Sequence, residues 1–124
     1  MVAAKRWKPD TPTKVILGVL VYEFRPEDRT KSEATIKKRL HYYKLGGYEQ
    51  DQVDSLRRFK DSLQDEIVRQ RGSQYYLGPH GDFGTLEDFD VQRMVADYNA
   101  AFPEIHVSEV EWFVPFALFT YYLR

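Results

Sequence analysis

The segment from Gly78 to Gly84 holds the residues of this chain that are best suited to chemistry. Its His80 and Asp82 are residue types that serve as a general base with an orienting acid, or as metal ligands. The segment has three glycines within seven residues, so its backbone amides are accessible, and it leads into an expected helix N-terminus, where anions are favoured. One hypothesis from the sequence is therefore a small enzyme centred on His80 and Asp82.

A plainer interpretation of this loop is a tight turn in which glycines adopt positive φ and His80 is solvated. The spacing matches neither the G-x-G-x-x-G fingerprint nor a phosphate-binding loop with its lysine. Asp82 begins an Asp-Phe-Gly tripeptide like that of protein kinases, but the companion kinase motifs are missing. His41, His80 and His106 are isolated, and no two have the spacing of metal ligands. We therefore expect a non-catalytic protein that binds no metal or cofactor.

A second cluster of functional side chains is basic and aromatic. The expected helix over 30–44 interleaves tyrosines with four cations, namely Lys37, Lys38, Arg39 and Lys44. Nucleic-acid grooves use cations for phosphates and rings for base stacking. Against this, the net charge of the chain is only -1, whereas nucleic-acid-binding domains are usually strongly basic. Nucleic-acid binding by this helix and the basic N-terminal arm is the second hypothesis, and a solvated helix face is its plainer alternative.

The C-terminal stretch is apolar and aromatic almost to its last residue, whereas chain ends are usually polar and frayed. Such a stretch must dock, either into the core of this protein or against another molecule. Small domains bury limited area, and aromatic residues are enriched at the centres of interfaces. The leading hypothesis is a protein-interaction or assembly component (an adaptor, accessory subunit or inhibitor) that binds a partner or a second copy. The residues predicted to contact the partner are Trp112, Phe113, Phe116, Phe119, Tyr121 and Tyr122.

Length and composition bound the architecture that positions these residues. The chain has 124 residues, of which 43% are hydrophobic and 30% charged, and no cysteine. These values predict one globular domain over 14–124, preceded by a flexible basic arm over 1–13. No apolar run is long enough for a signal peptide or a membrane span. We expect a soluble, cytoplasmic protein.

The distribution of hydrophobic residues predicts an α+β fold. The β-branched run over 14–24 and the apolar residues over 105–114 and 116–123 favour strands of a small mixed or antiparallel sheet. In the first run, Asp10-Thr11-Pro12 offers a helix cap as the alternative. Helical spacing of apolar residues predicts three helices packed against the sheet, over 30–44, 49–71 and 86–101. Pro115 argues against an uninterrupted helix at the C-terminus, although Ser108 to Glu111 imitates a helix capping box.

Overall fold

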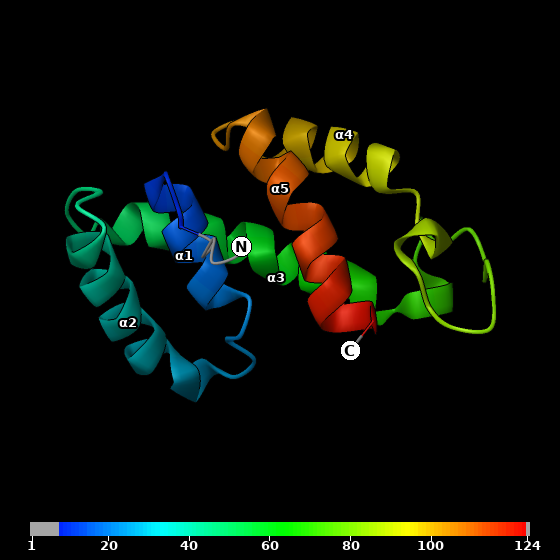
Figure 1. Ribbon diagram of the computed structural model, residues 1–124, viewed down its shortest axis with the longest axis horizontal. Coiled ribbons are helices and arrows are strands. Elements are labelled where there is room, and N and C mark those ends of the chain that lie inside the picture. The colour runs from blue at the N-terminus through cyan, green and yellow to red at the C-terminus, as the bar shows by residue number, and fades with distance from the viewer. Residues whose placement is uncertain (1–7, 124) are drawn as a thin grey trace, which may run out of the picture. The chain divides into compact units, whose positions relative to one another are not determined.

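Helices account for all the regular secondary structure in residues 8–123, the part of the chain that the computed structural model describes. Within this range no strand forms, and the only β pairing is an isolated antiparallel bridge between Tyr76 and Phe89. The predicted α+β fold is therefore wrong. The α-helices of the described residues are α1 (Pro12–Leu20), α2 (Arg29–Tyr42), α3 (Gln50–Val68), α4 (Val91–Ala101) and α5 (Val107–Leu118) (Figure 1).

The described residues fall into two compact units that divide within α3, between Val53 and Asp54. The predicted single domain over 14–124 stays a prediction. The predicted arm over 1–13 lies mostly outside the described residues, and its last two residues, Pro12 and Thr13, belong to α1. Among residues 8–123, no helix combines the length and the apolarity needed to cross a lipid bilayer.

The first unit contains α1 and α2, which pack against each other (Figure 1). The predicted strand over 14–24 is wrong because a helix cap dominates over β propensity. The Thr11 side chain accepts a hydrogen bond from the Lys14 amide at 3.1 Å, and Pro12 occupies the first turn, where its missing amide costs nothing. After α2, Gly46 turns the chain with φ +99, a conformation that glycine adopts without strain.

The second unit contains most of α3, followed by α4 and α5. The ring of Phe59 on α3 lies 6.1 Å from that of Tyr98, 5.3 Å from that of Phe102 and 5.6 Å from that of Phe113. These contacts join α3 to both later helices, and α4 also packs directly against α5. The helices predicted over 30–44 and 49–71 are present: α2 begins one residue earlier than predicted and ends two residues earlier, and α3 is shorter at both ends. The helix predicted over 86–101 is split, because a 3-10 turn, η3 (Leu86–Asp88), precedes α4.

The chain is helical from Val107 to Leu123, so the strands predicted over 105–114 and 116–123 are also wrong. The helix begins at a cap in which His106 Nδ1 accepts a hydrogen bond from the Ser108 amide at 3.1 Å. Its buried residues recur at steps of three and four, which is the spacing of one helix face. They include Val110, Phe113, Val114, Ala117 and Leu118.

Pro115 lies inside α5, and a π-helix, η4 (Phe119–Leu123), continues from its end. An interior proline costs roughly 3 kcal/mol in helix stability, because it removes one backbone hydrogen bond and crowds the preceding turn. Fully burying a single large apolar side chain contributes roughly 1.5–3 kcal/mol. Phe113 and Leu118 are both 0% exposed, so burial of the helix face offsets the proline.

Candidate functional site

The loop between α3 and α4 is held closed at its base by backbone hydrogen bonds around the Tyr76–Phe89 bridge. The Leu77 amide donates to the Asp88 carbonyl at 2.7 Å, and the Asp90 amide donates to the Tyr75 carbonyl at 2.8 Å. These bonds bring the two ends of the loop together, so residues 78–87 form a loop that is closed by hydrogen bonds at its base. The loop that the sequence singled out is therefore a structured element of the second unit.

Asp88 anchors this loop from within. Its side chain is 1% exposed, and its carboxylate accepts hydrogen bonds from three residues. The Tyr122 hydroxyl donates at 2.6 Å, the backbone amides of His80 and Thr85 donate at 3.0 and 3.2 Å, and the Thr85 hydroxyl donates at 3.4 Å. The Tyr122 hydroxyl lowers the pKa of Asp88 to about 2, with further lowering by the Thr85 amide and by His80. The carboxylate is thus ionised at neutral pH.

His80 also contacts this carboxylate through its ring. His80 Nδ1 lies 3.2 Å from Asp88 Oδ1 and 2.9 Å from the Gly78 carbonyl oxygen. A carbonyl oxygen accepts hydrogen bonds and never donates them, so Nδ1 carries a proton and Nε2 is the acceptor of the neutral ring. The acid that orients His80 is Asp88. Within residues 8–123 no hydrogen bond or ion pair joins His80 to Asp82, the pair that the sequence suggested.

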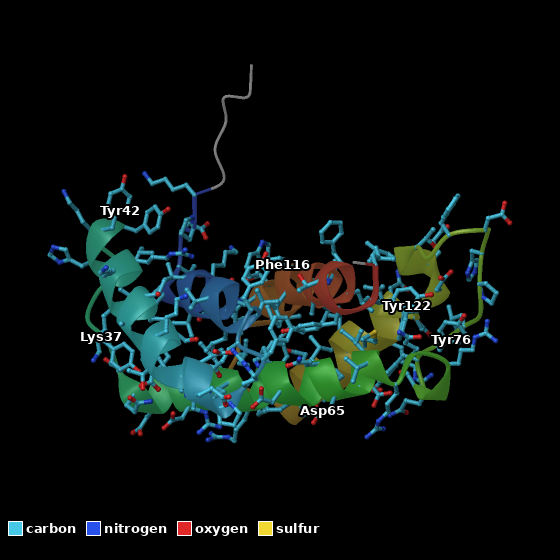
Figure 2. The ribbon with its side chains drawn as sticks, turned by 90° about the horizontal axis from the view of Figure 1, so that it is seen from below. Lys37, Tyr42, Asp65, Tyr76, Phe116 and Tyr122 are labelled. Atoms are coloured by element: carbon cyan, nitrogen blue, oxygen red, sulfur yellow. The ribbon has the colours of Figure 1, made fainter. Side chains whose placement is uncertain are left out.

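A cavity of about 200 Å³ opens beside the anchored loop. Its lining includes three aromatic residues, two aspartates and one arginine (Figure 2 shows Tyr76 and Tyr122 at one end of the second unit). The residues that line it are Gln70, Arg71, Tyr76, Pro79, Gly81, Asp82, Phe83, Gly84, Asp88 and Tyr122. Asp82 thus belongs to the lining of the cavity, while His80 does not.

Gly84 brings the loop into contact with the C-terminal π-helix η4. A Cβ atom at position 84 would lie 3.3 Å from side-chain atoms of both Tyr122 and Leu123. That spacing is tighter than ordinary van der Waals contact, so the absence of a side chain at Gly84 permits the close approach. The loop is consequently tied to η4 twice, by this contact and by the Tyr122–Asp88 hydrogen bond.

The predicted partner-binding aromatics of the C-terminus are mostly packed within the molecule. Phe113 is 0% exposed, and Trp112 and Phe116 are partly buried, with their rings 5.5 Å apart. Tyr121 is also partly buried, and Tyr122 bonds to Asp88. Phe119 differs, because it is 57% exposed. The sequence predicted that this stretch docks but wrongly predicted it as strands, and of its six aromatics only Phe119 is mostly exposed.

The predicted nucleic-acid residues lie in the first unit, on α2 and the turn after it. Lys37, Lys38, Arg39 and Lys44 are all exposed. The Lys37 ammonium lies 4.8 Å from the centre of the Tyr48 ring, a cation–π contact. The structure keeps these four cations on the surface (Figure 2 labels Lys37).

Several residues of the site were missed at the level of sequence, and Asp88 is the most important of them. Asp88 follows Thr85 by three positions, a spacing that indicates a helix cap, and the structure confirms the cap: Thr85 and Asp88 exchange hydrogen bonds. Burial of the carboxylate and its bond to Tyr122 depend on tertiary packing, which no local pattern reports. Tyr76, Phe83 and Arg71 had no signal beyond their positions near the loop.

No group of three or more histidine and carboxylate side chains in residues 8–123 could hold a metal ion. Comparison of the chain with protein-family models, with curated proteins and with solved structures finds no match.

Proposed function

We propose that this protein works by binding another protein, and that the loop over 77–86 in the second unit makes the contact. The observation that carries the proposal is the exposure of the Phe83 side chain. This side chain is 84% exposed, and Leu77 and Leu86 on the same loop are 59% and 37% exposed. Large apolar side chains gathered on one exposed loop are typical of interaction surfaces, where aromatic residues act as anchors.

The anchoring of the loop supports the same role. A flexible loop loses conformational entropy when a partner orders it, which weakens binding. Here the buried Asp88 already fixes the backbone at His80 and Thr85, on both sides of Phe83. The exposed ring therefore stands on a loop that is ordered before the partner arrives.

Charge indicates the chemistry of the partner. Residues 77–90 contain four acidic residues and no lysine or arginine. Complementary potentials accelerate association and reject partners of like charge. We therefore expect a partner whose surface is basic around an apolar pocket that receives Phe83.

The test compares the protein with two variants as immobilised baits in an extract of the native host. Phe83→Ala removes the anchor, and Val107→Ala removes an exposed apolar side chain at the start of α5 as the matched control. A partner should be retained by the unmodified protein and by Val107→Ala and lost by Phe83→Ala. Calorimetry with the purified partner should then show at least about tenfold weaker binding for Phe83→Ala, as expected of an interface hot spot.

Two outcomes bear on this proposal directly. If Phe83→Ala retains the same proteins with the same affinity as the unmodified protein, the loop is not the contact. If the partner is a second copy of the chain, sedimentation should show association that Phe83→Ala abolishes, which supports the proposal.

A second candidate function is nucleic-acid binding by α2. The observation in its favour is Tyr42, which is 75% exposed on a helix whose surface carries Lys37, Lys38 and Arg39 (Figure 2). An exposed ring among cations is suited to base stacking. Binding of single-stranded oligonucleotides at low salt should weaken steeply as salt rises and weaken further in Tyr42→Ala. Absence of binding at low salt would exclude this function.

A further inference from the structure

We propose that the cavity beside the anchored loop binds an alkylammonium group, namely a lysine-type side chain of the partner in its free or N-methylated form. The inference rests on the proposed function and deepens it, because it names the group that the partner inserts. The cavity is lined by three aromatic residues, Tyr76, Phe83 and Tyr122, and by two acidic residues, Asp82 and Asp88. Aromatic rings beside carboxylates are the surroundings in which proteins hold organic cations.

The two tyrosine rings are fixed in place by a shared neighbour. The rings of Tyr76 and Tyr122 each pack edge to face with that of Phe89, with centroids 5.6 and 5.0 Å away and interplanar angles of 80° and 72°. Phe89 itself is 2% exposed. This arrangement holds two walls of the cavity, while the third ring, Phe83, stands on the loop.

Charge favours a cation over an anion. Asp88 and Asp82 each contribute one negative charge, and the Arg71 guanidinium contributes one positive charge, so the lining has a net charge of -1. The Asp82 carboxylate forms no hydrogen bond or ion pair with another described residue, so it is free to face a ligand. An anion would be repelled by Asp82 and, through the protein, by the buried charge of Asp88, whereas the Arg71 guanidinium stands on an exposed side chain.

The neighbours of Asp88 do not reverse this balance. His80 contacts the carboxylate from outside the cavity lining, and Tyr122 contributes a neutral hydroxyl at physiological pH because the bond to Asp88 raises its pKa. Asp88 stays ionised under these conditions. Its negative charge is therefore a permanent part of the cavity wall.

The size of the cavity indicates a side-chain head rather than a cofactor. Its volume of about 200 Å³ is below the roughly 300–1,000 Å³ of sites for drug-sized molecules. Gly81 lines one edge, and a Cβ atom there would meet no other atom within 4 Å. Gly81 therefore places no side chain in the way of an extended lysine side chain at this edge.

The experiment is a titration of the ¹⁵N-labelled protein, followed by the amide signals of Gly81 and Gly84. The first probe is N-acetyl-trimethyllysine amide, and the second is its neutral isostere with a tert-butyl group in place of the trimethylammonium. The charged probe should produce saturable shifts at millimolar concentration. The neutral probe should bind roughly two- to thirtyfold more weakly, the range expected when a cation–π contact is lost.

Four variants test which residues determine binding of the charged probe. Phe83→Leu and Asp82→Asn should each weaken binding of the charged probe several-fold, because they remove an aromatic face and a carboxylate. Arg71→Gln should strengthen it, because a competing positive charge is removed. Glu111→Gln, an exposed carboxylate on α5 outside the cavity, should leave binding unchanged.

The results also separate this inference from the proposed function. Equal binding of the two probes, or no shift at Gly81 and Gly84 at tens of millimolar, would overturn the cation site even if Phe83→Ala still loses its protein partner. Binding of acetate or phosphate at the same amides, abolished by Arg71→Gln, would overturn it in favour of an anion site. Selective binding of the charged probe supports it even if no partner depends on Phe83, and in that case only the proposed function fails.

Discussion

The hydroxyl of Tyr122 donates a hydrogen bond of 2.6 Å to Asp88 Oδ2, joining residues that lie 34 positions apart in the sequence. The bond connects η4 to the short turn η3 before α4. The same carboxylate fixes the loop at His80 and Thr85. One side chain therefore holds together the C-terminal helix and the loop that carries the candidate site.

Replacing Tyr122 by Phe tests this relationship. The variant keeps the ring against Phe89 but removes the hydroxyl, so Asp88 loses the strongest of its hydrogen bonds. Loss of a hydrogen bond to a charged group should lower the melting temperature by roughly 3–8 °C. Thermal unfolding followed by circular dichroism measures the shift, and the control is Tyr42→Phe on α2, because Tyr42 is 75% exposed and its hydroxyl forms no hydrogen bond with another described residue. A melting temperature equal to that of the unmodified protein would contradict the role of the bond.

The free energy of unfolding should also depend on pH through the hydrogen bond between Tyr122 and Asp88. The folded-state pKa of Asp88 is about 2, against an ordinary value of 3.8. The contribution of Asp88 to the free energy of unfolding is therefore complete above pH 3.8 and is lost as the pH falls toward 2. The pKa of Tyr122 is raised above its ordinary value of 10.0 by the bond to Asp88, so its contribution is complete below 10.0 and is lost as pH rises further.

The free energy of unfolding by urea, measured at intervals of pH, checks both directions. The difference between the unmodified protein and Tyr122→Phe should be constant between pH 4 and pH 10 and should shrink outside that range. The difference isolates this pair, because other carboxylates with lowered pKa values, such as Asp10 and Glu104, titrate in both proteins. A difference that grows in acid would contradict the assignment.

The contact of Gly84 with η4 predicts unequal effects of alanine at two glycines of one loop. At Gly84 the new Cβ atom would lie 3.3 Å from Tyr122 and Leu123, whereas at Gly81 it would meet nothing within 4 Å. Neither glycine has a positive φ, so the difference comes from packing. We expect Gly84→Ala to destabilise by about 1–3 kcal/mol through overpacking and Gly81→Ala to have little effect. Equal unfolding free energies for the two variants would contradict the prediction and show that the loop and η4 shift to accommodate the new methyl group without cost.

The C-terminal aromatics should separate into structural and accessible residues. Phe113 is 0% exposed and Phe119 is 57% exposed. Phe113→Ala should cost about 3–5 kcal/mol of stability, the usual result of emptying a buried aromatic site. Phe119→Ala should cost less than about 1 kcal/mol, as exposed substitutions do. Chemical denaturation distinguishes these outcomes, and a large loss at Phe119 would mean that this ring is covered in solution.

Where apolar residues recur at helical spacing among polar ones, the sequence was sufficient to predict the helix. The predicted helices over 30–44 and 49–71 correspond to α2 and α3. It failed where nearly every residue is apolar, because a continuous apolar run fits a buried strand and a buried helix equally well. In α1 the cap at Thr11 decides between them, and in α5 the burial of Phe113 and its neighbours outweighs Pro115.

The candidate site was predicted in part. The sequence pointed to the loop from Gly78 to Gly84, and the structure places a cavity there with Asp82 in its wall. The sequence could not predict that Asp88 contacts His80. The Asp88 carboxylate is buried and bonds to Tyr122, which lies 34 positions away in the sequence. Local patterns report caps and faces, whereas the meeting of residues far apart in the sequence depends on how the helices pack.

The hydrogen bond between Tyr122 and Asp88 has a consequence for the order in which the second unit folds. Contacts between residues distant in sequence form late, because the chain between them must first be organised. The loop can reach its final geometry only after α5 and η4 have docked, so binding competence should arise last during refolding. Detachment of the terminal turn alone, without global unfolding, would remove Tyr122 from the lining of the cavity and its hydrogen bond from Asp88.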